Sequence, residues 1–564
     1  MNQNELLALA TGGWQEAPED WMPASQVHAL VLEDPALLWL EFHGAAFGLQ
    51  PDSLPYDLSG FLSQKARQFE ERWLAELSPE AVRVCRDGHE VRLAVRVAET
   101  LQLMASAAPV IAQPALWWAP EKIYGAPDLI VHTSWLGEHF PHLLTQEAQL
   151  QPHYVVFDLK FTSKIEESSK SKERQAYAVQ VRLYSYMLGQ MQGVMPSFAC
   201  LVTRDRVMDP FPVPITSQPG EPLEEDLRAL RDQFLEIKLN GARYQPWRDT
   251  IVASNPGNTD ERWRSAKQTI ARVKIPGGDV SQVYQIGTRT RLELIQLGYA
   301  SLEALLRVEP EALPLENLKG IGASKARQIR AILRANRTGQ AVLPSSDLIP
   351  PSKRYEFFVD YEYFVNIDVD FQQQWPNLEG REMIFMIGVG WMDGEIWVFE
   401  PLQARAETPA AESELFATFL ELLESQTGGA IYDSEQSALY HWTSAEVWQT
   451  QRAADRHGLP ADHALRHLPW TDLQKVFLNG PAGLPGALGY GLKEVAGALS
   501  AYDPTYSTHW PDELDQGLNA MVMGWQAYRQ PNPLETEEFS NLRRYLEQDC
   551  AALERLLRWL RDRS

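Results

Sequence analysis

An apolar stretch that ends in closely spaced charged residues stands out in the first third of the chain. In residues 154–161, four apolar or aromatic residues lead into Asp-Leu-Lys-Phe. The two-residue period of a strand puts Asp158 and Lys160 on one face. A neighbouring strand is predicted directly after Asp128. Two acids and a lysine could therefore converge on one metal-bound phosphate.

Helical periodicity flanks this strand. Residues 174–190 are predicted to form a helix on which Gln180 and Tyr184, at i and i+4, share one face. An earlier helix over residues 61–78 carries Glu70 beside an apolar stripe. The same pattern predicts helices over 99–107 and 223–239 and strands over 109–118 and 198–204. Glu121 is either an additional ligand or part of a solvated turn.

A second strand that ends in acids begins the last third of the chain. Asp360 and Glu362, two residues apart in the predicted strand 355–364, also share a face. Two carboxylates from one strand make a compact oxygen site for Mg²⁺ or Mn²⁺. Strands over 383–391 and 395–400, joined by Asp-Gly, form a predicted hairpin. A long amphipathic helix over 539–560 carries Tyr545 and Asp549 at i and i+4.

Glycines and basic residues mark the region between these two parts. Gly320 and Gly322 permit a tight turn whose backbone N–H groups can hold a phosphate. The helix after the turn brings basic residues close to it: Lys325, Arg327, Arg330, Arg334 and Arg337. Only one acid, Glu316, lies between 313 and 340. Residues 341–353, rich in Pro and Ser, are a predicted linker.

Length and composition indicate a multidomain globular protein. The chain has 564 residues, of which 45% are hydrophobic and 10% aromatic. Three domains are expected, at residues 1–250, 251–345 and 346–564. Net charge is −24, with 75 acids against 51 bases. Any contact with nucleic acid must therefore use local basic patches or metal ions, such as the basic loop with Lys164, Lys170, Lys172 and Arg174.

Several classes of protein are excluded or disfavoured. The cysteines, Cys85, Cys200 and Cys550, are too few and too far apart for a disulfide framework or a four-cysteine site. No signal-peptide pattern and no run of ~18 uncharged apolar residues occurs, so we expect a cytoplasmic protein with no membrane partner. The glycine-rich residues 479–489 lack the Lys-Ser/Thr of a phosphate-binding loop, and no ATP-driven helicase is expected.

The motifs of the first domain resemble those of a known nuclease family. Gly125-x-x-Asp128, Asp158-x-Lys160 and Gln180-x-x-x-Tyr184 resemble the RecB-like branch of the PD-(D/E)XK nucleases. The resemblance implies a further ligand from an earlier helix, for which Glu70 is the best match and Glu71 the alternative. It also implies that no iron–sulfur cluster is present here, because the relatives that carry one use four cysteines.

The other two parts have resemblances of their own. The turn at Gly320 and Gly322 resembles a helix-hairpin-helix domain that grips the DNA backbone, with Lys325, Arg327 and Arg330 as contacts. Asp360-x-Glu362 with Tyr545-x-x-x-Asp549 resembles the DEDD 3′–5′ exonucleases, and more widely the YprB-like RNase H-fold domain. There Tyr545 would orient the attacking water and Asp549 would complete the metal shell. A fourth acid is implied, either Glu446, with His441 where the family has Asn, or Asp472.

The whole order resembles that of predicted bacterial RecB family nucleases. The expected fold is a multidomain α/β protein with a restriction-endonuclease-like α/β/α core, a small all-α helix-hairpin-helix domain and an RNase H-like α/β domain. The resemblance implies metal-dependent cleavage of DNA, in repair or defence, with a helicase or repair partner acting in trans. Two alternatives stay open: a 3′-end exonuclease of RNA or DNA that uses only the C-terminal domain, and a non-catalytic nucleic-acid-binding scaffold.

Overall fold

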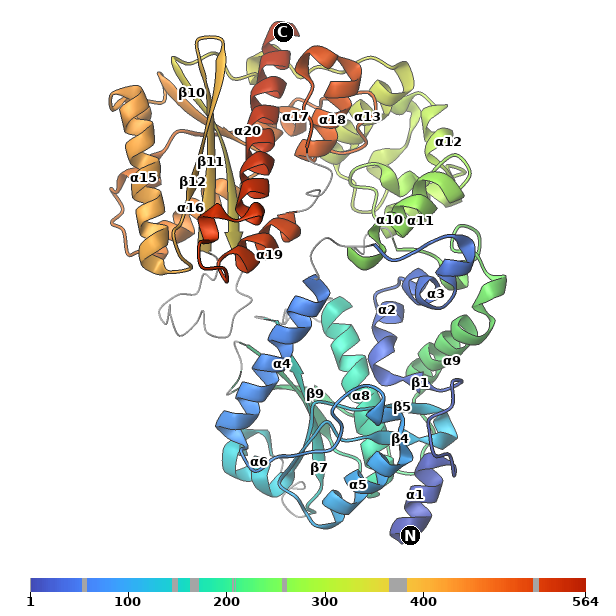
Figure 1. Cartoon of the computed structure of the whole chain (residues 1–564). Coiled ribbons are helices and arrows are strands. Elements are labelled where there is room, and N and C mark those ends of the chain that lie inside the picture. The colour runs from blue at the N-terminus through green and yellow to red at the C-terminus, as the bar shows by residue number, and fades with distance from the viewer. Residues whose placement is uncertain are drawn as a thin grey trace. The chain divides into compact units, whose positions relative to one another are not determined.

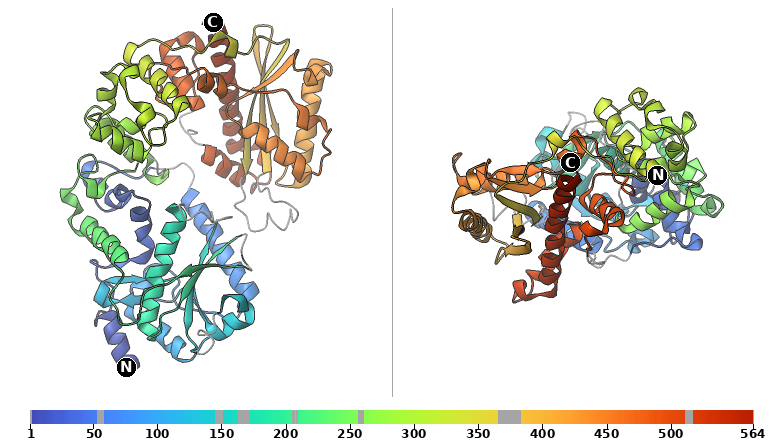
Figure 2. Two further views of the ribbon diagram at one scale, coloured as in Figure 1. Left: turned by 180° about the vertical axis from the view of Figure 1, so that it is seen from behind. Right: turned by 90° about the horizontal axis from the view of Figure 1, so that it is seen from above.

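The chain folds into two compact units, each described here by itself. The computed structural model describes residues 2–52, 58–144, 151–162, 172–204, 207, 209–255, 261–364, 383–510 and 517–563. The first unit comprises Met1–Asp52 and Leu62–Ile270, and the second comprises Ser53–Phe61 and Ala271–Ser564. Figures 1 and 2 show the elements of both. None of the described helices is long and apolar enough to cross a membrane.

The first unit is built on two sheets with helices around them. Its helices are α1 (Gln3–Thr11), α2 (His28–Val31), α3 (Pro35–His43), α4 (Leu58–Leu77), α5 (Ala94–Ala105), α6 (Thr133–His139), α8 (Lys172–Gln192), α9 (Glu225–Asn240) and α10 (Arg264–Thr269). Its strands are β1 (Met22–Pro23), β2 (Val82–Arg83), β3 (Val110–Ala112), β4 (Leu116–Trp118), β5 (Ile123–Gly125), β6 (Leu129–His132), β7 (Tyr154–Lys160), β8 (Phe198–Thr203) and β9 (Phe211–Pro214). The sheet orders are β1-β5-β4 and β2-β3-β6-β7-β8-β9.

Strand β7 lies inside the six-stranded sheet, as its almost continuous apolar sequence predicts. It pairs antiparallel with β6 and parallel with β8. One face of β7 packs on α4, where the rings of Phe157 and Trp73 are 6.4 Å apart. The other face bears Asp158 and Lys160 toward α8, so the alternation of the strand separates its core face from its chemical face.

The prediction of one continuous strand over residues 109–118 is wrong. The range contains two strands, β3 and β4, that belong to different sheets. Gln113 adopts a left-handed backbone with φ of 48°, and Pro114 follows it, so the chain turns sharply between them. This turn carries β4 away from β3 and places Gln113 beside Asp128 at the start of β6.

The second unit is built on a five-stranded mixed sheet. Its strands are β10 (Tyr355–Phe364), β11 (Met383–Asp393), β12 (Ile396–Gln403), β13 (Ser437–His441) and β14 (Trp470–Asp472), in the order β12-β11-β10-β13-β14. Its helices are α11 (Thr288–Gln296), α12 (Leu302–Leu306), α13 (Ala323–Thr338), α15 (Pro409–Thr427), α16 (Ala445–Arg456), α17 (Gln474–Asn479), α18 (Leu492–Tyr502), α19 (Gly517–Ala527) and α20 (Glu537–Arg563). The predicted hairpin is confirmed, with Gly394 at φ 65° in its turn.

Helices cover both faces of this sheet. On one face, Tyr361 packs on Phe416 of α15 and hydrogen-bonds Thr450 of α16 at 3.1 Å. On the other face α20 lies along β10 and β11 (Figure 1). Gly388, paired with Asp360 across the two strands, permits this close approach. A β-carbon there would lie 3.2 Å from Cys550 Sγ and 3.2 Å from Leu546 Cβ on α20.

The helices before the sheet share its hydrophobic core. Buried residues from Val280 to Leu333 form one cluster with residues from Ile349 to Leu560. Polar contacts join the same parts, since Asn336 of α13 donates to Ala487 O at 2.8 Å and accepts from Gly486 N at 2.9 Å. The helical segment and the mixed sheet therefore form one compact unit.

Candidate active sites

The end of β7 and the start of β6 bring two acids and a lysine together in the first unit. The register pairs Leu129 with Phe157, so the next position places Asp128 opposite Asp158. Asp158 is buried, and its Oδ2 lies 2.5 Å from Lys160 Nζ. Asp128 Oδ2 accepts the backbone N–H of Leu159 at 2.6 Å. The predicted convergence of these three residues is thus present.

Helix α8 adds its two predicted residues. Gln180 Oε1 accepts a hydrogen bond from Lys160 Nζ at 3.1 Å, and Gln180 Nε2 donates to the Tyr184 hydroxyl at 3.1 Å. A β-carbon at Gly125 would lie 2.7 Å from Cε1 of Tyr184. The glycine of the Gly125-x-x-Asp128 motif is therefore needed so that the buried Tyr184 ring can pack against the strand end.

The acids of this group repel one another and attract Lys160. Burial, followed by the charges of Asp158 and Glu70, raises the pKa of Asp128 well above its ordinary value. Burial also raises the pKa of Glu70, with Asp158 adding to the rise. Burial alone would lower the pKa of Lys160, but attraction to Asp158 and Asp128 raises it, so the ammonium stays charged.

Glu70 reaches the site from α4, and its neighbour Glu71 is exposed. A small pocket is lined by Glu70, Asp128 and Gln113 among other residues. Gln113 was missed in the sequence. Its Nε2 donates to Asp128 Oδ1 at 3.0 Å, and its backbone N–H donates to Asp128 O at 2.8 Å. Its left-handed backbone depends on tertiary packing, and no sequence pattern marks it.

The predicted basic loop is only partly within the described residues. Lys164 and Lys170 lie outside them. Lys172 pairs with Glu33 at 2.7 Å, and the Arg174 guanidinium lies 4.4 Å from the centre of the Phe211 ring. These two cations therefore make contacts within the first unit.

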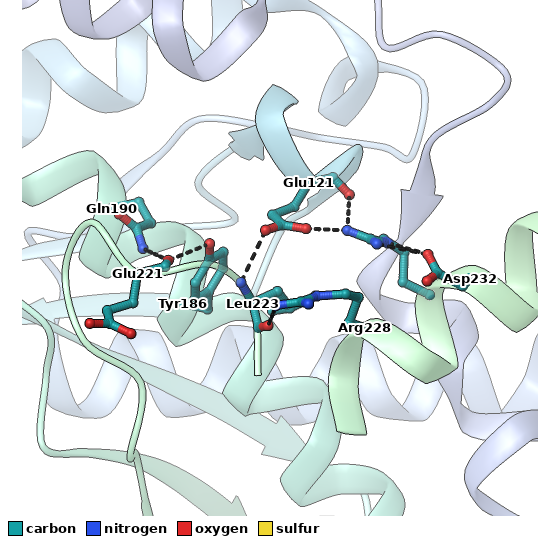
Figure 3. A network of polar contacts seen from close by, with 8 residues as sticks. Glu121, Tyr186, Gln190, Glu221, Leu223, Arg228 and Asp232 are labelled. Carbon is teal, nitrogen blue, oxygen red and sulfur yellow. Dashed lines mark hydrogen bonds and ion pairs between the residues drawn. The ribbon is translucent and has the colours of Figure 1, made fainter. Parts of the chain in front are cut away.

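Glu121 has a role in the fold instead of the site. Its carboxylate accepts the Leu223 N–H at 3.0 Å and pairs with Arg231. Figure 3 shows the network, in which Tyr186 and Gln190 both donate to Glu221 O. The Glu121 carboxylate is thus engaged by donors within the fold, which argues against both a ligand role and a solvated turn.

The second unit gathers its acids between β10 and α20. Glu362 and Asp549 are buried, and Asp360 is half-buried. Burial, followed by repulsion from Asp549, raises the pKa of both Asp360 and Glu362 well above the ordinary value. Burial raises the pKa of Asp549 to about 6, although attraction to Lys493 opposes the rise. The register of β10 and β11 shifts between Glu362 and Tyr363. Irregularities of this kind are frequent next to active sites.

Other predicted residues of this site come from α20, α16 and β14. Burial raises the pKa of Tyr545, one helical turn before Asp549 on α20. Glu446, near the start of α16, forms a hydrogen bond with His441 Nδ1 at 3.1 Å through its Oε2 as the acceptor. Its charge is among those that raise the pKa of Asp360. Asp472 instead lies 3.5 Å from Lys475. Of the two candidates for the fourth acid, Glu446 lies close enough to Asp360 for its charge to act on that residue.

One comparison with known proteins bears on this unit. Residues 377–561 match the family model of the RNase H superfamily. The range contains Glu446, Tyr545 and Asp549 but begins after Asp360 and Glu362. Strand β10 nevertheless belongs to the same sheet, because it pairs with β11 and β13. The chain thus contains an RNase H-like domain, which indicates a nucleic-acid hydrolase. No curated protein and no solved structure was found to match the chain.

Two residues of the RNase H-like domain escaped the sequence reasoning. Trp510 Nε1 donates to Asp549 Oδ1 at 2.7 Å. Lys493, at the start of α18, lies with Nζ 4.6 Å from the centre of the Tyr545 ring. Both are far from the acids in sequence and belong to no spaced motif. Only the packing of α18 on α20 brings Lys493 to the site.

The turn at Gly320 and Gly322 is present as predicted, but several of the basic side chains near it are paired with acids. Gly320 has φ of 88°, and α13 starts directly after Gly322. Lys325 and Arg327 are exposed. Arg330 is engaged in the fold, since it donates to Pro310 O and Leu313 O, each at 3.0 Å, and pairs with Glu316. Two acids that precede residues 313–340 also form ion pairs with arginines of α13, in the pairs Arg334–Glu311 and Arg337–Glu309.

The acids of both candidate sites are the kind of ligand that a divalent cation prefers. RNase H-like nucleases generally use divalent metals, and both acid groups consist of oxygen donors. Among the described residues, no three His, Cys, Asp or Glu side chains are grouped closely enough to hold an ion as they stand. Burial and the mutual repulsion of carboxylates raise the pKa of Asp128 and Asp360, and a divalent cation would offset that repulsion.

Proposed function

We propose that this chain is a metal-dependent nuclease that hydrolyses phosphodiester bonds in DNA. The observation that supports it best is the group of carboxylates in the RNase H-like domain, Asp360, Glu362 and Asp549, whose pKa values are all raised. Packing like charges in a buried place opposes folding, so such groups cluster where function requires them. The site would act as a 3′–5′ exonuclease.

Each residue of this site has a role under the proposal. Asp360, Glu362, Glu446 and Asp549 would hold Mg²⁺ or Mn²⁺. A bound ion of this kind lowers the pKa of coordinated water and offsets charge on the phosphoryl oxygens. Tyr545 would orient the attacking water through its hydroxyl group, and its raised pKa keeps that hydroxyl protonated at neutral pH.

A second, RecB-like site is proposed in the first unit. Asp128 and Asp158, with Glu70, would hold a cation. Lys160 stays charged beside Asp158 and would stabilise negative charge on the phosphate. The bonds from Lys160 to Gln180 and from Gln180 to Tyr184 fix the ammonium in place. The surrounding sheet would be a restriction-endonuclease-like core.

DNA is the proposed substrate, and RNA is the alternative. The exposed turn at Gly320 and Gly322 offers backbone N–H groups, and the exposed Lys325 and Arg327 add positive charge beside it. Contacts of this kind hold a backbone without selecting sequence. The proposed setting is DNA repair or defence, with a helicase or repair partner in trans.

Substitution of one acid in each site tests the proposal. Asp158→Asn, Asp549→Asn and the double variant are compared on end-labelled single-stranded and duplex DNA and RNA with Mg²⁺ or Mn²⁺. We expect each single variant to lose its own product pattern by about a hundredfold or more, because a displaced ligand misplaces the reacting groups. The double variant should retain binding.

Two acids outside the sites serve as matched controls. Asp232 pairs with Arg231 and Asp503 pairs with Arg563, so their Asn variants should cleave like the unmodified chain. Undiminished cleavage by the double variant would exclude both sites. Salt-sensitive binding without any metal-dependent product would favour the scaffold alternative.

A further inference from the structure

Lys493 places a positive charge beside the acids of the RNase H-like domain. Its Nζ lies 4.6 Å from the centre of the Tyr545 ring, within the range of a cation–π contact. Its charge opposes the rise in pKa of Asp549 and of Glu362. One ammonium group thus faces the tyrosine and two acids, although it comes from another helix.

The position of Lys493 conflicts with local helix electrostatics. It is the second residue of α18, where the positive end of the helix dipole disfavours a cation. The neighbouring Glu494 has the sign that this position prefers, and its Oε1 accepts the Leu488 N–H at 2.8 Å. A residue that breaks a local rule is expected where function requires it.

The glycine-rich loop before α18 fixes where Lys493 lies. Tyr490 is buried, and its hydroxyl donates to Ala482 O at 2.8 Å. Trp442 Nε1 and Gln474 Nε2 both donate to Tyr490 O at 3.0 Å. Asn336 of α13 holds Gly486 and Ala487 from the other side. This loop is therefore a rigid support for α18 and its lysine.

We propose that Lys493 is the phosphate-binding residue of the C-terminal site and receives a phosphodiester of the nucleic-acid strand next to Tyr545. The proposal rests on the proposed function of that site. The acids alone would repel a phosphate, and Lys493 supplies a positive charge from the α18 side of the site. Its contact with the Tyr545 ring would also keep the tyrosine in place while the strand is bound.

The test uses the full chain with the first site silenced by Asp158→Asn. Lys493→Met, Lys493→Arg and the surface control Arg529→Met are compared in that background. Arg529 pairs with Glu407 at 3.1 Å and is half exposed. Cleavage of a 5′-labelled single-stranded oligonucleotide with Mn²⁺ gives KM and kcat. Binding of the same oligonucleotide in EDTA is measured from about 50 to 200 mM salt.

We expect Lys493→Met to raise KM roughly tenfold or more, as the loss of a hydrogen bond to a charged group does. The slope of log K against log salt should become shallower by about 0.7, which corresponds to one phosphate contact on a single strand. Lys493→Arg should keep KM and the salt slope close to those of the parent, and Arg529→Met should change neither KM nor the slope. Thermal unfolding checks that the variants are folded.

Unchanged KM and an unchanged salt slope for a folded Lys493→Met would overturn the proposal. A loss confined to kcat would also overturn it, because it would assign Lys493 to the support of Tyr545 alone. If the Asp158→Asn parent shows no cleavage that Asp549→Asn removes, the proposed function of the site fails. The salt slope in EDTA would then still decide whether Lys493 binds phosphate.

Discussion

The pKa values of carboxyl side chains shift in opposite directions at different places in this chain. Side-chain hydrogen bonding to Arg330 lowers the pKa of Glu316 to about 2, and bonding to Arg563 lowers the pKa of Asp503. Burial raises the pKa of Asp549, and burial followed by the charges of Asp158 and Glu70 raises the pKa of Asp128. Residue type therefore does not distinguish a structural acid from a candidate ligand, whereas the surroundings do.

The raised pKa of Asp549 predicts that this acid destabilises the metal-free protein at neutral pH. Its folded pKa of about 6 exceeds the ordinary value of 3.8, so the cost is absent below about pH 4, grows up to about pH 6 and is complete above it. At about 1.36 kcal/mol per pKa unit, the upper limit is about 3 kcal/mol. Asp549→Asn should therefore raise the unfolding temperature in EDTA at pH 7 more than at pH 4.

Asp503→Asn is the control for this measurement. Its pKa is lowered by Arg563, so its stabilising effect is present at neutral pH and is lost as the pH falls through its folded value. Asp503→Asn should leave the protein unchanged or slightly less stable at pH 7. Equal responses of the two variants would contradict a raised pKa of Asp549 in the folded protein.

Gly125 gives a second prediction at the residue scale. Gly125→Ala would place a β-carbon 2.7 Å from the Tyr184 ring, and we expect a loss of about 1–3 kcal/mol in unfolding free energy together with reduced first-site cleavage. Gly88 has open space around it, so Gly88→Ala should affect neither quantity. Denaturant unfolding and cleavage assays of both variants check this, and a neutral Gly125→Ala would show that Tyr184 can move without loss.

At the scale of elements, the C-terminal site depends on how closely α20 approaches the sheet. Gly388 of β11 lies against Cys550 and Leu546, and this contact carries Tyr545 and Asp549 toward Asp360. A side chain at position 388 would push the helix away from the strand that bears the acids. The spacing of the site is thus set by a residue that takes no part in its chemistry.

Gly388→Val should reduce cleavage by the C-terminal site about a hundredfold, because ligands on α20 would shift by ~1 Å or more relative to Asp360. Val389, on the opposite face of β11, is fully buried. Val389→Ala should cost stability, by roughly 1–3 kcal/mol, without the loss of cleavage. Cleavage and unfolding are measured for both, and a similar loss of cleavage in the two variants would reduce the effect of Gly388→Val to general destabilisation.

At the scale of the whole molecule, the helical segment and the RNase H-like domain depend on each other. Their buried residues form one hydrophobic cluster, and Asn336 and Gln328 of α13 donate to backbone carbonyls of residues 478–487. A separate helix-hairpin-helix domain would keep its own core. Here part of that core is supplied by the domain that follows in sequence.

A truncation series tests this dependence. A fragment of residues 271–564 should unfold cooperatively, whereas residues 346–564 alone should expose the apolar surface that α11, α12 and α13 cover and should be unstable or aggregated. Circular dichroism during heating and limited proteolysis measure both. A fragment 346–564 that melts at the same temperature as 271–564 would show that the RNase H-like domain is an independent unit.

The sequence predicted the elements that carry the chemistry well. Strand β10 and helix α20 were expected over 355–364 and 539–560 and are present, because their apolar periods of 2 and 3.6 residues are long and regular. The strand over 109–118 was wrong, because its division depends on one left-handed residue, Gln113, which periodicity does not reveal. The positive charge of residues 313–340 was overestimated, because Glu309 and Glu311 lie just before that range and pair with Arg337 and Arg334.

The sequence by itself determined which side chains could act together at short range. The backbone repeat of a strand or helix puts both members of each spaced pair on one face. These pairs are Asp158 with Lys160, Asp360 with Glu362, Gln180 with Tyr184, and Tyr545 with Asp549. Only the tertiary structure decided which of these pairs meet, and which residues support them. Gln113 reaches Asp128 through a turn, and Lys493 reaches Tyr545 through the packing of α18 on α20. Such long-range contacts arise from the burial of apolar surface over the whole core, which no local spacing records.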